Sequence, residues 1–406
     1  MFVDQEPVMF NPLQEGYIEN PWPHLAELRA ADPVHRLFTG QWGLFRHDDI
    51  FTLLRDPSLS VDDVNANLDE MAQTAMFEEH ARDLEPDRSI LNIDPPDHTR
   101  LRRLVSQAFT PRTIETLRPM VQQLVDDALN AMAAAGQADL VSGLAFSLPF
   151  DVISEMLGMP ASDKIQIRDW SAAIVKTIDP VITEDEVVAA AEASRNMNRL
   201  ITEVIEWKRA NSADDLLSAL IDAEDDGDRM STSELRDQVA LLFIAGHETT
   251  VNLIGTGIYE LLRHPDQLAH LAADPALVPG AVEELLRYVS PVQLTRRIAT
   301  SDLEIRGRRI PKGSFVLCSL ASANRDPDFW GADAEELNLG RANSSQHVSF
   351  GSGVHYCLGA SLAKLEAETA IGSFVRRFAR AHVVGEPEWN GRINLRGLEK
   401  LELGFS

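Results

Sequence analysis

One long segment, residues 231–264, constrains the fold more than any other part of the chain. Ser231 and Glu234 have the spacing of a helix capping box, and Pro265 marks where the helix ends. A continuous helix of this length is roughly 50 Å long. The run 241–245 in its middle is apolar on all sides, which is typical of a buried helix. The rest of the chain must therefore fold around one central helix.

Helical patterns also dominate elsewhere, with a helix that begins at Pro111, restarts near Pro119 and stops at Gly136. Further helices are predicted over 279–289 and 358–378, with a strand over 41–46 and strands and turns over 292–320. The acidic stretch 65–85 is predicted to be a loop or short helix. The linkers are short and the composition does not shift. We therefore expect a mainly α fold with small β-sheets, as one domain over residues 1–406 in which 1–19 are an extended N-terminal segment.

The charge balance and the cysteine count exclude several classes of protein. Lys and Arg number 37 against 63 Asp and Glu, a net charge of -26. This argues against binding to nucleic acid or to an anionic membrane surface. Two cysteines in 406 residues make no disulfide framework, and no signal peptide or membrane anchor is visible. The sequence thus favours a cytoplasmic protein.

The segment 350–360, FGSGVHYCLGA, is the most informative motif. Its glycines allow tight turns and the close approach of a flat ligand. Cys357 falls where this loop enters a helix, whose amino terminus favours a thiolate. A single thiolate on such a platform suits an axial iron ligand. The alternatives are a buried free cysteine, a phosphate-binding loop and a zinc site, but the glycine spacing and the lack of further ligands disfavour the last two.

This loop resembles the haem-thiolate signature of the cytochrome P450 family, and the resemblance extends from about residue 20 to the carboxyl terminus. It implies the single-domain P450 fold with a long helix over the haem, and the soluble bacterial type. It implies haem b (iron protoporphyrin IX), bound without a covalent link. Cys357 is then the iron ligand, and Phe350, Gly351 and Gly359 contact the haem from the same loop.

The segment 245–250, AGHETT, interrupts the long apolar helix with a glycine, a carboxylate and two threonines. Such residues are unusual in a buried helix and often mark function. A local explanation is open, in which Thr249 bonds back to the Ala245 carbonyl and Glu248 is an ordinary ion-pair partner. The resemblance instead implies that Glu248 and Thr249 deliver protons during oxygen activation. It places Ala245 and Gly246 beside the haem, where Gly246 leaves room for oxygen.

Further positions match family residues that support the haem. The resemblance implies that the two haem propionates bind four basic residues, His98, Arg102, Arg297 and His355. Glu284 and Arg287 match a buried structural pair that holds the segment before the cysteine loop. Many relatives add an arginine from that segment, but the matching stretch 334–338 contains none, so no third member is expected there.

The predicted function is a haem-thiolate monooxygenase that inserts one atom of O2 into a hydrophobic small molecule. A terpenoid, steroid, fatty acid or macrolide would fit. The tentative pocket residues are mostly apolar: Leu242, Phe243, Ala245, Val292, Leu294 and Thr295. A peroxide-dependent peroxygenase and a non-oxygenating haem protein that only binds ligands are the alternatives.

The resemblance also implies partner proteins, since the chain shows no reductase domain. Ferredoxin and a ferredoxin reductase fed by NAD(P)H would supply the electrons. A local set of basic residues could dock an acidic ferredoxin, although a merely solvated helix face explains them equally well. This set comprises Arg100, Arg102, Arg103, Arg112, Arg118, Lys364, Arg376 and Arg377.

Overall fold

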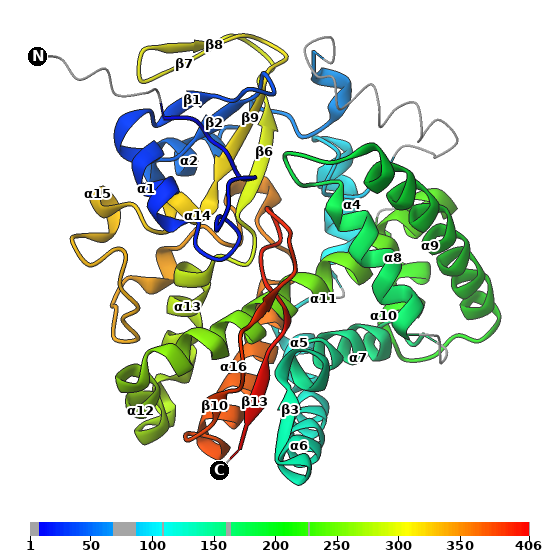
Figure 1. Cartoon of the computed structure of the whole chain (residues 1–406). Coiled ribbons are helices and arrows are strands. Elements are labelled where there is room, and N and C mark those ends of the chain that lie inside the picture. Colours follow the sequence, from blue (N-terminus) through cyan, green and yellow to red (C-terminus); the bar gives the residue numbers. More distant parts are fainter. Residues whose placement is uncertain (1–7, 68–86, 108, 160–163, 226–227, 406) are drawn as a thin grey trace, which may run out of the picture.

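The computed structural model describes residues 8–67, 87–107, 109–159, 164–225 and 228–405 (Figure 1). Most of the stretch 65–85, predicted as a loop or short helix, lies outside these residues. Residues 12–19, within the predicted extended segment, form turns. Phe10 and Tyr17 anchor this segment, because both are buried in a small core cluster with Phe45.

Helices make up most of the molecule, as the sequence predicts. They are α1 (Trp22–Ala31), α2 (His47–Leu54), α4 (Asp97–Ser106), α5 (Pro111–Thr116), α6 (Arg118–Ala135), α7 (Ser147–Met156), α8 (Lys164–Lys176), α9 (Glu184–Ala210), α10 (Leu216–Asp222), α11 (Thr232–Arg263), α12 (Pro265–Ala273), α13 (Val278–Val289), α14 (Leu320–Ala323), α15 (Pro327–Trp330) and α16 (Ala360–Arg377).

Helix α11 is the predicted central helix, and Figure 1 shows it crossing the molecule behind the carboxyl-terminal hairpin. The Ser231 side chain accepts from the Glu234 amide and the Glu234 side chain accepts from the Ser231 amide, so the capping box is present. The helix packs against α7, α9, α13 and α16. Among the described residues, it alone is long and apolar enough to cross a membrane, but 61% of its most apolar window is buried inside the molecule.

The strands form small separate sheets. Their bounds are β1 (Val34–Arg36), β2 (Trp42–Leu44), β3 (Gln137–Asp139), β4 (Glu224–Asp225), β5 (Asp228–Arg229), β6 (Leu294–Ile298), β7 (Leu303–Ile305), β8 (Arg308–Ile310), β9 (Phe315–Ser319), β10 (His382–Val383), β11 (Glu388–Trp389), β12 (Leu398–Lys400) and β13 (Glu402–Gly404). The largest sheet has the order β1-β2-β9-β6, in which β2 and β9 are parallel and the other pairs antiparallel. Strand β2 confirms the strand predicted over 41–46.

The helix boundaries follow local chemistry. Pro119 lies in the first turn of α6, where its missing amide costs no hydrogen bond, and α5 ends just before it. Gly136 ends α6 in the left-handed conformation, with φ of 72°. The last long helix, α16, begins at Ala360 rather than at the predicted residue 358. The difference arises because Gly359 is not helical and serves as its amino-terminal cap residue.

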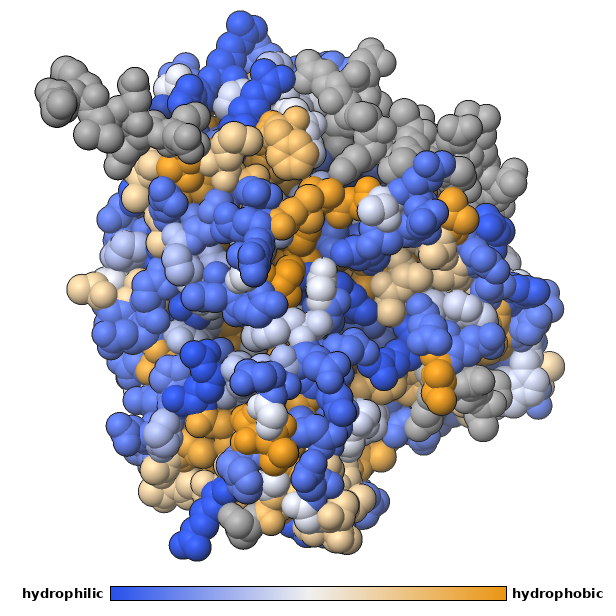
Figure 2. All heavy atoms as spheres, in the orientation of Figure 1, coloured by the Kyte–Doolittle hydropathy of each residue, from blue (hydrophilic) through white to orange (hydrophobic). Residues whose placement is uncertain are grey.

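The main apolar core lies around α11, where α6, α7, α9, α13 and α16 contribute buried side chains. A second cluster fills the space between the large sheet and α2. The face in Figure 2 is mostly hydrophilic, with apolar groups gathered where the strand-rich part meets the helices. This layout leaves the cysteine loop before α16 on one side of the central helix.

Candidate functional site

The loop before α16 is held in a single tight conformation. The Cys357 amide donates to the Phe350 carbonyl over 2.9 Å and closes the loop. Gly351 and Gly353 have φ values of 69° and 72°, which residues other than glycine rarely adopt. A Cβ on Gly353 would lie 2.5 Å from the carbonyl oxygen of Leu54. The predicted glycine turns therefore exist, and the packing of α2 requires one of them.

Cys357 is the cysteine that can reach a ligand. It is exposed, and it lies just before the amino terminus of α16. Burial raises the pKa of its thiol, while the amides of Gly359 and Ala360 and the charge of Arg102 lower it. A bound metal ion would deprotonate this thiol. Cys318, by contrast, is fully buried in β9, and burial raises its pKa to about 12.

Helix α11 presents an accessible strip within the core. Ala245 is exposed although most of α11 is buried, and Leu241 and Thr249 are partly accessible one turn on either side. This spacing places the three residues on one face of the helix. Gly246 does not share that face, since a Cβ there would lie 3.6 Å from Ile153 of α7. Gly246 is half-buried, and the room for oxygen that the resemblance implies there stays a prediction.

The Thr249 hydroxyl makes the hydrogen bond back to its own helix that the sequence allows as an alternative. Its Oγ1 donates to the Ala245 carbonyl oxygen over 3.0 Å. A hydroxyl that donates one bond still has lone pairs with which to accept others. The side chain thus has a fixed orientation and a free acceptor on the accessible strip.

Glu248 is held by a partner that the sequence does not reveal. Its Oε2 lies 2.6 Å from Nη1 of Arg392, in the loop between β11 and β12, and both side chains are largely buried. His247 lies 3.6 Å from Oε1, too far for a hydrogen bond, so the contact with Arg392 is the firm one. Burial acts to raise the pKa of Glu248, but His247 and Arg392 outweigh it and lower the pKa to about 2. Glu248 is therefore an anion in this arrangement.

Basic groups with few partners converge near the loop. The rings of His98 and His355 are 4.3 Å apart, and neither nitrogen of buried His98 has a hydrogen-bond partner within the described part of the chain. Arg297 is buried, and among described residues its guanidinium donates only to the Arg296 carbonyl. Burial lowers the pKa of Arg297 and, with the charges of His98 and Arg297, lowers that of His355 to about 4. Unsatisfied donors and an uncompensated cation fit the two carboxylates of a haem.

Arg102, the fourth predicted propionate partner, lies one turn after His98 on α4. Its Nη2 donates to the carbonyl oxygen of Tyr356 over 2.6 Å, so it ties α4 to the cysteine loop. Burial lowers the pKa of Arg102, while the charge of Cys357 raises it. His98 thus lies against His355, Arg102 contacts the loop at Tyr356 and Arg297 acts electrostatically on His355, while their role toward the propionates stays a prediction.

The Glu284–Arg287 pair is fully buried and has a third member. Arg287 donates to both oxygens of Glu284 and to the carbonyls of Asn324, Ala334 and Glu336. The stretch 334–338 supplies no arginine, as expected, but the network is completed by a residue outside it. Arg341, just beyond the stretch 334–338, donates to Glu284 over 3.2 Å. The network pins the segment that leads into the cysteine loop.

The predicted substrate residues do not all share one surface. Phe243 is 1% exposed and packs its ring against Phe150 and His247, and Leu294 is buried in the small cluster with Phe45. Leu242 is buried as well, whereas Ala245 is exposed and Val292 and Thr295 are half-buried. Ala245, Val292 and Thr295 are therefore the accessible members of the set.

Acids neutralise part of the predicted basic surface. Arg100 is paired with Asp228 and Glu234, Arg118 with Glu115, and Lys364 with Glu283. Arg103, Arg112, Arg376 and Arg377 remain exposed. The basic groups available for docking are thus fewer than the sequence suggests.

Comparisons with known proteins show which family the chain resembles over most of its length. A family model described as Cytochrome P450 matches residues 52–390. The chain is 41% identical over 383 residues to Cytochrome P450 107B1 of Saccharopolyspora erythraea, covering 91% of each protein. It is 41% identical over 402 residues to the Cytochrome P450 monooxygenase PikC of Streptomyces venezuelae, covering 96% of this chain and 92% of that protein.

A solved structure extends the likeness to the fold. The bacillaene polyketide synthase cytochrome P450 PksS of Bacillus subtilis matches with a TM-score of 0.87 and 37% identity. The match covers 98% of this chain and 100% of that one.

Proposed function

The chain belongs to the cytochrome P450 family and is a monooxygenase of that family, and from this premise we propose its reaction and partners. It inserts one oxygen atom from O2 into a hydrophobic small molecule, with haem b as its cofactor. The observation that carries the proposal is the exposed Cys357, which lies in a loop turned by glycines just before α16. With haem bound, the Cys357 thiolate would hold its iron and supply the electron density that favours oxygen activation.

The residues of the chain divide the work around the cofactor. Haem, when bound, supplies the redox-active iron that activates O2. His98, Arg102, Arg297 and His355 would hold its propionates, since their donors converge beside the loop. The cysteine loop would contact the haem through Phe350, Gly351 and Gly359. The small side chain of Ala245 would leave room for it on the side of α11.

Glu248 and Thr249 are proposed to deliver protons to the reacting oxygen. The free acceptor of the Thr249 hydroxyl lies on the accessible strip of α11 and can hold a water or a proton-bearing group there. Glu248 can take part only if it leaves Arg392 or passes protons through a water, because its carboxylate is now ion-paired. The surrounding apolar core keeps bulk water out of this path.

The substrate is proposed to be hydrophobic, because the accessible strip of α11 is largely apolar. Terpenoids, steroids, fatty acids and macrolides fit this description. The PksS structure is described as part of a polyketide synthase, which supports the macrolide end of the range. The proposed substrate contacts are the accessible residues Ala245, Val292 and Thr295. The buried residues Phe243, Leu242 and Leu294 would support the pocket through core packing.

The electron source is proposed to be a ferredoxin with its NAD(P)H-fed reductase, in the cytoplasm. Arg112 and Arg377 are exposed and can meet an acidic partner. The net charge of -26 makes such docking depend on local basic groups, because the remainder of the surface repels an acidic protein.

The reduced carbon monoxide difference spectrum of the purified protein tests the proposal first. A red-shifted Soret band is expected for a thiolate-ligated haem, and Cys357→Ala should lose it. A band at the shorter wavelength of a neutral ligand in natively folded protein, or no haem uptake on reconstitution, would overturn the proposal. Product formation with ferredoxin, its reductase and O2 then tests the monooxygenase reaction.

A peroxide-driven peroxygenase is a second candidate, because the Glu248 carboxylate is held by Arg392 in this structure. Hydrogen peroxide alone would then support product formation as fast as the electron-transfer chain does. A haem protein that only binds ligands would consume NADH through the partners without an organic product.

A further inference from the structure

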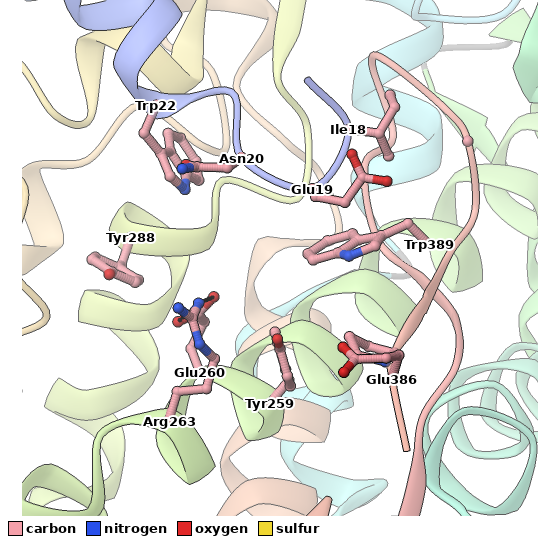
Figure 3. Close-up of a pocket in the computed structure, with 12 residues that line it drawn as sticks. Ile18, Glu19, Asn20, Trp22, Tyr259, Glu260, Arg263, Tyr288, Glu386 and Trp389 are labelled. Atoms are coloured by element: carbon pink, nitrogen blue, oxygen red, sulfur yellow. Dashed lines mark hydrogen bonds and ion pairs between the residues drawn. The ribbon is translucent and has the colours of Figure 1, made fainter. Parts of the chain in front are cut away.

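A cavity of about 720 Å³ opens on the molecular surface, apart from the residues assigned to haem, oxygen and substrate (Figure 3). It lies among the segment 18–22, the end of α11, the end of α13 and the loop entering β11. Four aromatic rings line it, those of Trp22, Tyr259, Tyr288 and Trp389. None of the residues proposed for the reaction is part of its lining. A cavity of this size can hold a small organic molecule.

Three of the four rings are held in place from inside the protein, and the fourth, that of Tyr259, contacts the ring of Trp389. The Arg396 guanidinium lies 3.9 Å from the centre of the Trp389 ring, and its Nε and Nη2 donate to the carbonyls of Ile18 and Glu19. Arg325 lies 3.6 Å from the centre of the Trp22 ring and 3.9 Å from that of Tyr288. The rings are therefore fixed before any ligand arrives, which reduces the entropic cost of binding.

Each ring is also open on part of its surface. Trp22, Tyr259, Tyr288 and Trp389 are all half-buried rather than buried. The rings of Tyr259 and Trp389 stand 6.2 Å apart at an angle of 83°. Figure 3 shows Tyr259 pointing toward Trp389 from α11. Such a corner of two aromatic faces is the usual receptor for an organic cation.

The charges around the cavity favour the same class of ligand. Figure 3 shows Glu19 and Glu386 on either side of the Trp389 ring. Both are exposed, and neither carboxylate is ion-paired to any residue that the structure describes. Glu260 is paired with Arg263 at 3.2 Å, and the positive charge of Arg396 is buried behind the Trp389 ring. Arg263 also lines the cavity, is exposed and lies 5.5 Å from the centre of the Tyr259 ring, so the accessible charges are two free carboxylates and one guanidinium that is paired with Glu260.

We infer that this cavity binds an organic cation of the quaternary ammonium or arylammonium class. The cation rests against the faces of Trp389 and Tyr259, and Glu19 and Glu386 supply the opposite charge. An anion would meet two carboxylates and the field of a protein with a net charge of -26. A neutral apolar molecule gains nothing from the carboxylates. The inference does not depend on the proposed reaction.

Calorimetric titration of the haem-loaded protein with phenyltrimethylammonium tests the site. Its neutral isostere tert-butylbenzene and the anion benzoate serve as comparisons, and the Soret band is recorded in each titration. The cation is expected to bind with no change in the Soret band, because the cavity shares no residue with the haem site. Tighter binding of tert-butylbenzene or benzoate, or a Soret shift that follows the cation, would overturn the inference.

Two variants locate the binding. Glu19→Gln combined with Glu386→Gln should weaken cation binding roughly three- to tenfold, and Trp389→Leu should weaken it roughly tenfold. Glu388→Gln is the matched control, because Glu388 is an exposed carboxylate of β11 outside the cavity lining. If Trp389→Leu fails to fold, the cation affinity of the double glutamate variant still tests the site. An unchanged affinity in the double variant, or an equal loss in Glu388→Gln, would refute the site.

Discussion

The Arg392 guanidinium lies 2.6 Å from Oε2 of Glu248, which joins the loop between β11 and β12 to the centre of α11. The two residues are 144 positions apart in the sequence. Against burial, which acts to raise the pKa of Glu248, His247 and this contact together depress it, so Glu248 is an anion rather than a neutral acid ready to donate. Any proton delivery by Glu248 therefore depends on how firmly Arg392 holds it.

Replacing Arg392 should expose this dependence. Arg392→Gln leaves Glu248 buried without its cation, so its pKa should rise and the protein should lose roughly 1–3 kcal/mol of stability. In the native chain the pair's contribution is present above the ordinary carboxyl pKa near 4.5 and is lost as the pH falls toward about 2. Urea unfolding across this acidic range should show that loss in the native protein and a flatter curve in Arg392→Gln.

Arg392→Lys is the control, because it keeps the charge while it loses the planar guanidinium. The stability of Arg392→Lys should still fall at acidic pH, nearly as much as that of the native protein. Identical pH curves for the native protein and Arg392→Gln would contradict the assignment of the depressed pKa to this pair.

Glu366 should produce the opposite pH dependence. It is fully buried in α16, neither carboxylate oxygen has a hydrogen-bond partner among the described residues, and burial raises its pKa well above the ordinary value near 4.5. The folded state then binds this proton more tightly than the unfolded state, so stability falls as the pH rises above that value. Glu366→Gln should remove this fall and gain stability at neutral pH.

Unfolding curves of Glu366→Gln and the native protein, measured from acidic to neutral pH, check the prediction. Glu368→Gln is a matched control on the same helix, since Glu368 is less buried and its pKa is raised less. A native-like pH slope in Glu366→Gln would show that the carboxyl has a partner that stabilises its charge.

Arg341 should matter nearly as much as Arg287 for stability. Its guanidinium is buried and bonds Glu284 and Asp333. Arg341→Gln removes one of the two cations that hold Glu284, which Arg287 still pairs, at a cost of roughly 1–3 kcal/mol. Denaturant unfolding and the rate of haem loss measure the effect. Arg309→Gln breaks an exposed pair with Asp302 and should change neither.

The contacts of Arg341 and Arg392 could not be predicted from the sequence. The capping box of Ser231 and Glu234 and the glycine turns before Cys357 are local signals, so they were predictable. Arg341 meets Glu284 across 57 positions and Arg392 meets Glu248 across 144, and no periodic pattern connects such partners. Both contacts depend on how separate elements pack.

The central helix shows a second limit of the sequence. Because the run 241–245 is apolar on all sides, it does not reveal which face of the helix carries the accessible strip. Phe243 is packed in the core while Ala245 is exposed, and only the packing of α7 against α11 distinguishes them. The helix was predictable, but the orientation of its side chains was not.

Gly353 should be intolerant of any side chain. Its φ is 72°, and an added Cβ would lie 2.5 Å from the Leu54 carbonyl oxygen. Gly353→Ala should cost roughly 1–3 kcal/mol and weaken haem retention, because the loop must shift. Gly280→Ala is the control, since its Cβ would meet nothing within 4 Å inside α13 and should stabilise that helix. Equal unfolding midpoints for the two variants would refute the argument.

Thr249 should control how well electrons are coupled to product. The Thr249 hydroxyl lies on the accessible strip of α11, and its removal takes away an acceptor for the proton path. Thr249→Ala should keep the haem and the thiolate spectrum but divert electrons from NADH into hydrogen peroxide. Thr250→Ala is the matched control, because Thr250 is buried and bonds the Gly246 carbonyl at 3.4 Å. Peroxide released per NADH consumed is the measurement, and an equal ratio in both variants would show that Thr249 does no more than satisfy its own helix.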